Sequence, residues 1–213
     1  MSPPLGVSAA FWRLVVTERL DELTALDVGT GAGRLVLALA ARCRRVVGID
    51  RAPEPLAEAR RRAAAAGLAN VEFVVADAEA GEYDVWAPDL VVAHLCMSDA
   101  IIVRAGRALA PGRVLAFVAF HSDQWRETGR ASRFAYDEEH ARGALSRAGF
   151  AVEHLEVERE VTTFGSVEEA LAAVVALEER WKVDGRWFQY IRFLEEGGRT
   201  LTRSHLIVKA RRA

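Results

Sequence analysis

The sequence predicts an α/β fold in which helices cover both faces of a mostly parallel sheet. Short apolar runs alternate with helical segments at the spacing of βαβ units, and these runs lack the polar alternation of half-exposed strands. Strands that are apolar throughout are buried on both faces, so helices must cover each side of the sheet. The chain has 213 residues, which is enough for a core of ordinary size.

The first two thirds of the chain supply five expected strands and the helices between them. Ser8 is expected to cap a first helix, and Pro53 suits the first turn of a later helix that stops at Gly67. Ser98 is expected to cap the helix that ends before Pro111. The strands are expected at residues 25–28, 45–49, 71–76, 90–93 and 114–120, and a further helix at 34–42.

The last third differs, because its expected strands are longer and two helices follow one another between them. Ser166 is expected to open a helix that Asp184 and Gly185 break. The remaining elements are a helix at 137–149, a strand at 150–161, a helix at 186–196 and a final strand at 200–209. We therefore expect a single domain of residues 1–213 with a helical insertion at about 164–198 before the last strand.

Composition narrows the classes of function. The formal net charge is -2, so the basic excess that is typical of nucleic-acid-binding proteins is missing and nucleic acid is a disfavoured partner. The two cysteines form no CxxC pair and the five histidines lie far apart, so no metal is expected. The first residues have no secretory signal pattern, and no apolar run is long enough to span a bilayer, so we expect a cytoplasmic protein without a membrane partner.

The strongest signal of a site is a glycine-rich turn, residues 29–33, between an expected strand and an expected helix. The helix N-terminus offers free N–H groups and a partial positive charge, and glycine lets a ligand approach the backbone closely. Polar residues also stand at other strand ends, namely Asp50, Asp77 and the stretch 94–99. Ligands of open α/β sheets bind at the carboxyl ends of the strands, so we expect one binding site there.

The turn does not fit the glycine pattern of dinucleotide-binding folds, because the third glycine position falls on Arg34. Its glycines alternate instead, with Asp27 two positions before the first. Residues 27–33 resemble the D/E-x-G-x-G-x-G motif of class I S-adenosylmethionine-dependent methyltransferases, and residues 109–113 resemble the L-x-P-G-G/R turn before that family's fifth strand. The resemblance covers roughly residues 8 to 160. It implies a Rossmann-like methyltransferase fold with an antiparallel last strand, S-adenosylmethionine as cofactor and S-adenosylhomocysteine as product.

The resemblance also implies roles for residues at the strand ends. Asp50 stands where the family has the acidic residue that binds both ribose hydroxyls, and Asp77 where it has one that holds the adenine amino group. Each has a plainer use, since Asp50 can cap the next helix and Asp77 can form a turn. Asp27 either orients the turn or meets the ammonium of the ligand. The expected cofactor-binding residues are Asp27, Gly29, Thr30, Gly31, Gly33, Asp50, Arg51, Asp77, Ala78 and His94.

The residues that would contact the methyl acceptor are less clearly marked in the sequence. His94, after the fourth strand, has an ordinary pKa suited to a general base near neutrality, but it can equally orient the cofactor or satisfy a backbone group. His121, after the fifth strand, is the second candidate catalytic residue, in a stretch that either lines an acceptor pocket or decorates a loop. Arg126, Arg130 and Arg133 can recognise an acidic acceptor through guanidinium forks, although a solvated polar loop is the favoured interpretation.

Aromatic residues crowd the segment between the last two strands. They can wall an apolar pocket, pack a core or form a subunit contact, and packing is favoured. If these aromatic residues form a subunit contact, we expect a homodimer. The residues are Trp181, Trp187, Phe188 and Tyr190.

A methyltransferase acting on a small molecule is the leading interpretation. Asn-Pro-Pro-Tyr-type motifs, typical of methylation at amide or exocyclic amino nitrogens, are absent from the sequence, which counts against such acceptors. The alternatives are an NAD(P)-dependent oxidoreductase, which the missing third glycine opposes, and a non-catalytic methyltransferase-like binding protein. A methyltransferase of RNA or protein is disfavoured by the acidic charge balance.

Overall fold

The computed structural model describes residues 2–132 and 134–213, so the interpretation of Arg133 lies outside the described residues. The chain divides into two compact units. Unit 1 holds the residues up to Ala119 together with Glu138–Glu156 and Ile207–Ala213, and unit 2 holds Phe120–Asp137 and Val157–Leu206. The helices of the expected insertion belong to unit 2, and a single domain over the whole chain stays a prediction.

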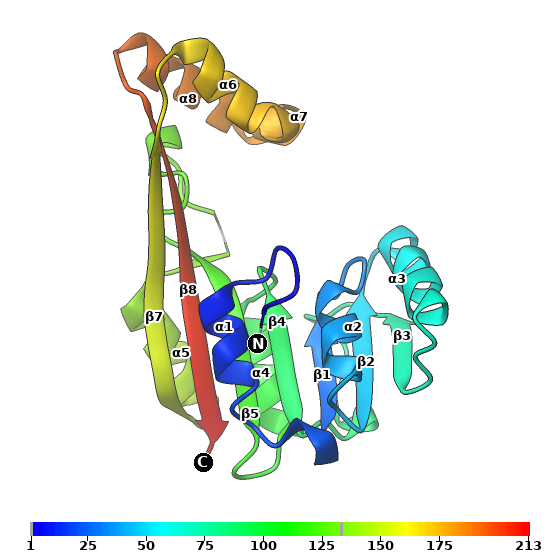
Figure 1. Cartoon of the computed structure of the whole chain (residues 1–213). Coiled ribbons are helices and arrows are strands. Elements are labelled where there is room, and N and C mark those ends of the chain that lie inside the picture. Colours follow the sequence, from blue (N-terminus) through cyan, green and yellow to red (C-terminus); the bar gives the residue numbers. More distant parts are fainter. Residues whose placement is uncertain (1, 133) are drawn as a thin grey trace. The chain divides into compact units, whose positions relative to one another are not determined.

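Five parallel strands form the centre of unit 1, and they confirm the predicted parallel sheet (Figure 1). The sheet order is β3-β2-β1-β4-β5-β8-β7, with β8 antiparallel to its neighbours, as the resemblance implied. The parallel strands are β1 (Thr24–Val28), β2 (Arg45–Asp50), β3 (Val71–Val75), β4 (Leu90–His94) and β5 (Val114–His121). The two long strands β7 (Phe150–Thr163) and β8 (Thr200–Arg212) have residues in both units.

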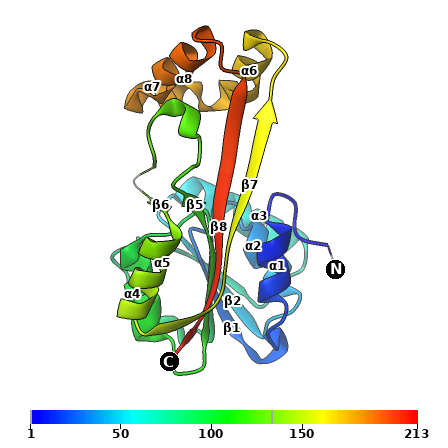
Figure 2. The same ribbon diagram turned by 90° about the vertical axis from the view of Figure 1, so that its left-hand side faces the viewer.

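Helices cover both faces of the sheet in unit 1, which confirms the three-layer prediction (Figure 2). Ser8 and Ser98 cap their helices as expected, since their hydroxyls accept hydrogen bonds from the N–H groups of Phe11 and Ile101. One face carries α1 (Ala9–Val15), α2 (Arg34–Ala40) and α3 (Pro53–Ala65), and the other carries α4 (Asp99–Ala108) and α5 (Glu138–Arg147).

The core of unit 1 lies where the helices meet the apolar strands. Every residue of β1 is buried, because helices lie over both of its faces. Phe11 and Trp12 of α1 pack with Leu39 of α2 and Val92 of β4 in one hydrophobic cluster. None of the helices among the described residues is long and apolar enough to cross a membrane.

Unit 2 is built on aromatic packing. Trp181 is fully buried, and its ring makes edge contacts with Trp125 at 5.2 Å and Tyr190 at 5.9 Å between centroids. Trp187 joins the same core, whereas Phe188 is exposed, so packing is confirmed for all but one of the four expected aromatics. The helices of this unit are α6 (Val167–Val174), α7 (Glu178–Asp184) and α8 (Arg186–Glu195).

Two features of unit 2 differ from the predictions. The helix expected from Ser166 to Asp184 is interrupted by a 3₁₀ turn at Val175–Leu177, where two adjacent β-branched valines lower helix propensity. A short strand, β6 (Ala135–Tyr136), pairs with the end of β5 and was not predicted, because two residues carry no periodicity.

A cluster of charged residues links β8 to the segment after α1 in unit 1. Glu18 contacts Lys209 Nζ and accepts a 2.9 Å hydrogen bond from Arg211 Nη2. Lys209 is nearly buried, with 8% of its side chain exposed, and it also donates to Thr17 Oγ1 at 2.9 Å. Burial opposes ionisation of Glu18, but the hydrogen bonds from Arg211 and Lys209 outweigh burial and lower its pKa.

We expect Glu18→Gln to lower the free energy of unfolding by about 1–3 kcal/mol at neutral pH, because it removes the nearer of the two carboxylates that pair with a nearly buried lysine; the other, Glu153, lies 3.7 Å from Nζ. Glu22→Gln is the matched control, since Glu22 pairs with Arg19 at 67% side-chain exposure, and it should stay within about 0.5 kcal/mol of wild type. Urea unfolding measures both changes. The lowered pKa stabilises the fold above the ordinary glutamate range, so the loss should shrink as pH falls through that range. A loss that is equal at low and neutral pH would contradict this account.

Candidate functional site

The turn between β1 and α2 requires its three glycines. Gly29, Gly31 and Gly33 have φ values of +71°, +53° and +78°, a region that residues with a Cβ rarely adopt. The N–H groups of Gly29 and Thr30 donate to the carbonyl of Ile49 at 2.9 and 3.0 Å, which ties the turn to the end of β2. The turn is therefore held in one conformation at the carboxyl ends of two neighbouring strands.

The glycines also differ in what surrounds them. A Cβ at Gly29 would overlap the side chain of Cys96, and one at Gly33 would lie 2.9 Å from Cβ of Ala59. At Gly31 a Cβ would meet nothing within 4 Å. Two glycines thus allow close packing within unit 1, and Gly31 borders open space.

A cavity of about 130 Å³ lies beside the turn in unit 1. It brings together five of the predicted residues, from the end of β1, the turn and the end of β4. Its lining consists of Val7, Asp27, Gly29, Thr30, Gly31, Ala32, Arg34, Leu35 and His94.

Asp27 is the most unusual group in this lining. Its side chain is buried and its Oδ2 has no hydrogen-bond partner, which is costly for a carboxylate. Burial is the main cause that raises the pKa of Asp27 to about 7; the hydroxyl of Thr30 opposes this rise and the negative charge of nearby Asp50 adds to it. The cavity lining therefore includes a buried carboxylate oxygen without a hydrogen-bond partner.

Asp50 accepts hydrogen bonds from both the glycine turn and the segment that leads into α3. Its Oδ2 accepts from the N–H of Gly31 at 2.8 Å, and its Oδ1 accepts from the N–H of Ala52, the N-cap residue of α3, at 2.9 Å. Each carboxylate oxygen has two lone pairs, so each can accept one more hydrogen bond. The capping interpretation of Asp50 is wrong, because Ala52 is the N-cap residue of α3 and Asp50 holds only the segment that leads into the helix. The carboxylate keeps capacity for a ligand. Arg51, next in the chain, is exposed.

Asp77 and Ala78 form a turn after β3. Asp77 Oδ1 accepts from the N–H of Glu79 at 2.8 Å, as expected of a turn former. The carbonyl of Ala78 accepts from the hydroxyl of Tyr83 at 2.7 Å, which fixes this loop. Neither residue lines the cavity beside the glycine turn, so their predicted contact with adenine stays a prediction.

His94 ends β4 and faces the N-terminal segment. Its Nε2 accepts from the N–H of Ser8 at 3.3 Å, and its ring lies 5.9 Å from that of Phe11. A neutral His94 therefore carries its proton on Nδ1. Burial raises the pKa of the nearby Cys96 thiol to about 11, so this cysteine is protonated at neutral pH.

His121 belongs to unit 2, and it is almost fully buried there. Its Nδ1 accepts from the N–H of Asp123 at 3.2 Å and lies 3.1 Å from Oγ of Ser204. These contacts give His121 a role in holding the end of β5. A catalytic role for His94 or His121 stays a prediction.

Several lining residues were missed by sequence reasoning. Val7 reaches the cavity from the segment before α1, and no sequence pattern marks it. Arg34 stands at the third position of the dinucleotide pattern, where it lines the cavity and donates to the carbonyl of Leu5 at 3.4 Å. The sequence signal that could have identified Arg34 is the departure from that glycine pattern, because it places a long side chain at the first position of α2.

Comparison with known proteins defines the class. The profile of a methyltransferase domain family matches residues 20–198, most of the chain. The chain belongs to this family, that of the class I S-adenosylmethionine-dependent methyltransferases.

One relative with a similar sequence is itself named as a methyltransferase. The chain is 35% identical over 107 residues to a ubiquinone biosynthesis O-methyltransferase of Leptothrix cholodnii, a match that covers 47% of this chain and 46% of that protein. The chain thus spans less than half of that relative's length.

Solved structures share the fold over nearly the whole chain. The YcgJ protein of Bacillus subtilis is 15% identical with a TM-score of 0.74, covering 95% of this chain and 97% of that one. A putative methyltransferase of Bacillus halodurans C-125 is 20% identical with a TM-score of 0.69, covering 96% and 99%. At these identities the likeness shows the fold.

We expect Gly29→Ala to be more destabilising than Gly31→Ala, by roughly 1–3 kcal/mol. Both substitutions strain a positive φ, but only the new methyl group at position 29 overlaps Cys96. Chemical unfolding of both variants measures the difference. Equal losses would mean that the Cys96 side chain moves aside and that backbone strain alone explains the glycines.

Proposed function

We propose that the chain binds S-adenosylmethionine beside the glycine turn and transfers its methyl group to a small-molecule acceptor. The observation that carries the proposal is the buried carboxylate of Asp27, whose Oδ2 lacks a partner in the lining of a cavity at this turn. An uncompensated buried carboxylate favours a cationic ligand group, and the amino-acid end of S-adenosylmethionine carries an ammonium.

The residues at the strand ends fit such a ligand. Asp27 would receive the ammonium, and the turn at Gly31, which borders open space, would lie along the amino-acid end. Asp50 would use its remaining lone pairs for the ribose hydroxyls. Arg51, Asp77 and Ala78 would surround the adenine, as the family resemblance implies.

The protein's part in the reaction is binding and orientation. When bound, S-adenosylmethionine supplies a methyl group already activated on a sulfonium. Holding this group in line with an acceptor atom can supply up to ~7–11 kcal/mol of the acceleration. His94 accepts the N–H of Ser8 through Nε2, so we assign it first to positioning the N-terminal segment. An acceptor that ionises easily needs no protein base.

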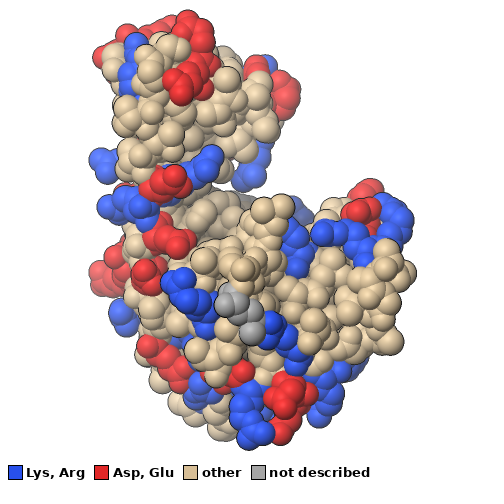
Figure 3. Space-filling model, viewed as in Figure 1, with Lys and Arg blue, Asp and Glu red and all other residues tan. Residues whose placement is uncertain are grey.

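A small molecule is the acceptor class that we favour. The net charge of -2 lacks the basic excess of nucleic-acid-binding proteins. On the face drawn in Figure 3, acidic and basic side chains are interspersed and form no continuous basic surface. The name of the Leptothrix cholodnii relative, a ubiquinone biosynthesis O-methyltransferase, also points to a small acceptor. The cytoplasmic location and the homodimer stay predictions.

Calorimetric titration of the purified chain with S-adenosylhomocysteine, beside NAD and NADP, tests the cofactor. We expect saturable binding of S-adenosylhomocysteine alone, because the third glycine of the dinucleotide pattern is replaced by Arg34. Binding of a nicotinamide cofactor instead would overturn the proposal. Binding of none of the three would leave a methyltransferase-like protein that has lost its cofactor.

The variant Asp27→Asn tests the role of the buried carboxylate. At pH 8 we expect its affinity for S-adenosylhomocysteine to fall about tenfold or more, because an ammonium loses its charged partner. In the wild type the carboxyl must release a proton to bind the ammonium, so affinity should rise with pH up to about 7. Asp21→Asn, at an exposed position of unit 1, is the matched control and should bind like wild type.

The same variant has a second readout in the free protein. Folding raises the pKa of Asp27 from 3.8 to about 7, so the wild type loses stability as pH rises across this range. Asparagine has no proton to lose, and Asp27→Asn should therefore be more stable than wild type at pH 8, by up to about 4 kcal/mol. Thermal unfolding at pH 4 and pH 8 measures the effect. Unchanged affinity together with unchanged stability would return Asp27 to a role in shaping the turn.

A further inference from the structure

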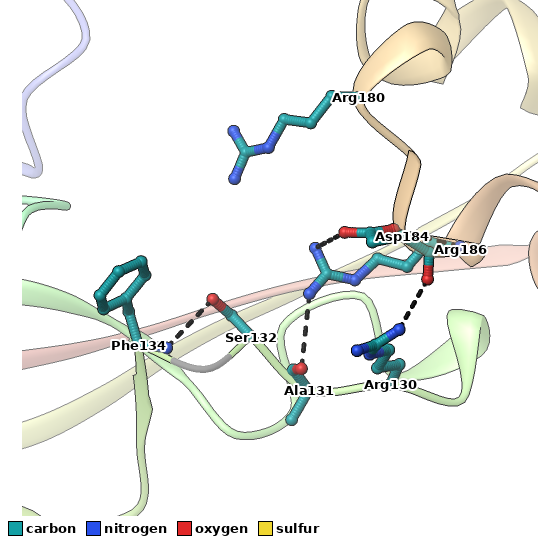
Figure 4. A pocket seen from close by; sticks show the side chains of 7 residues that line it. All are labelled: Arg130, Ala131, Ser132, Phe134, Arg180, Asp184 and Arg186. Carbon is teal, nitrogen blue, oxygen red and sulfur yellow. Dashed lines mark hydrogen bonds and ion pairs between the residues drawn. The ribbon is translucent and has the colours of Figure 1, made fainter. Parts of the chain in front are cut away.

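Unit 2 contains a cavity of about 340 Å³ that has no part in the proposed cofactor site. Its walls come from the loop after the 3₁₀ turn at Arg126–Thr128 and from the junction of α7 with α8 (Figure 4). The lining residues are Arg130, Ala131, Ser132, Phe134, Arg180, Asp184 and Arg186. The volume suits a small molecule.

Arg186 is the buried charge of this cavity, with 6% of the residue exposed. Its Nη1 lies 3.4 Å from Asp184 Oδ2, and its Nη2 donates to the carbonyl of Ala131 at 3.4 Å. Its Nε is buried without a hydrogen-bond partner. The guanidinium also lies over the ring of Trp125, with Cζ 5.7 Å from the ring centroid. Because a guanidinium has five N–H donors, the two long polar contacts leave much of its capacity to donate hydrogen bonds unused.

Two further arginines add charge to the same cavity. Arg130 donates to the backbone carbonyl of Asp184 at 2.8 Å, a contact that leaves its positive charge unneutralised. Arg180 is exposed, extends toward the cavity in Figure 4, and forms no ion pair among the described residues. Burial lowers the pKa of Arg186, and the charges of Arg180 and Arg130 lower it further, against the opposing effect of Asp184.

The lining thus has three guanidinium groups and one carboxylate. We propose that this cavity binds a small oxyanion ligand with at least two negative charges, a dicarboxylate or a phosphate monoester. A guanidinium fork can bind two oxygens of either group at once, and the hydroxyl of Ser132 can donate a further hydrogen bond. Phe134, which also lines the cavity, offers an apolar surface for the carbon part of the ligand.

Other ligands fit less well. S-adenosylmethionine has a sulfonium and an ammonium, which three arginines would repel. A nucleic acid needs a basic surface that follows its backbone, whereas these arginines converge on one cavity. The inference does not depend on the proposed methyl transfer, because it concerns binding to unit 2 in the absence of any cofactor.

The experiment is calorimetric titration of the full chain with inorganic phosphate and, separately, with malonate, at an ionic strength held constant with sodium chloride. We compare the wild type with Arg180→Gln, which removes one charge from the cavity while breaking no ion pair of the described residues. Arg192→Gln is the matched control, since Arg192 is an exposed arginine of α8 outside the cavity lining. Far-UV circular dichroism checks that both variants are folded.

We expect saturable binding of phosphate or malonate to the wild type, about tenfold weaker binding to Arg180→Gln and unchanged binding to Arg192→Gln. No saturable binding to the wild type would overturn the proposal. So would equal weakening in the two variants, which would indicate a general effect of net charge, or wild-type affinity in Arg180→Gln. Titration of the same samples with S-adenosylhomocysteine reports separately on the cofactor site, so the two proposals can fail independently.

Discussion

The carboxylate of Asp27 is held at the end of a strand whose residues are all buried, and its Oδ2 has no hydrogen-bond partner. A buried carboxylate is stable only when it is protonated, hydrogen-bonded or paired with a cation. Burial and the nearby charge of Asp50 bring its pKa to about 7, so near neutrality small changes in surroundings decide its charge. The glycine turn, the tie to Ile49 and the cavity lining all lie around this group. In the proposed function this carboxylate would pair with the ammonium of the cofactor.

The conformation of the glycine turn is set by its short length and by its contacts with Asp50. A chain that leaves β1 and enters α2 within five residues must reverse sharply, and its positive φ angles exclude most residues. Asp50 then fixes the turn by accepting the N–H of Gly31, and it also accepts the N–H of Ala52 in the segment that leads into α3. One carboxylate therefore connects the glycine turn, β2 and the segment before α3, so removing it would disturb these structural contacts together with any proposed ligand contact.

The sequence predicts those parts of the fold that depend on residues close together in the chain. Continuous apolar runs located the parallel strands to within one or two residues, and Ser8 and Ser98 located two helix starts. The glycines and Asp27 also carried a local signal, because few conformations accept that spacing. The cavity of unit 2 had none, since Arg130 and Arg186 are far apart in the chain and only folding joins them. The contact of Ser8 with His94 depended in the same way on folding, which brings together residues far apart in the chain.

The net charge of the chain says less about its ligands than the local charge at each proposed site. A net charge of -2 suggests a protein without strong electrostatic preference, and on that basis nucleic acid was disfavoured as a partner. The two proposed sites nevertheless differ in local charge. In unit 1 the carboxylates of Asp27 and Asp50 stand at the glycine turn, with Arg34 also in the cavity lining, and in unit 2 three guanidinium groups share a cavity with one carboxylate. Desolvation makes each local excess matter more than the total, because a charge in a cavity is screened less than one on the surface. A nearly neutral chain can therefore hold two sites of opposite preference, one for a cationic ligand group and one for an anion.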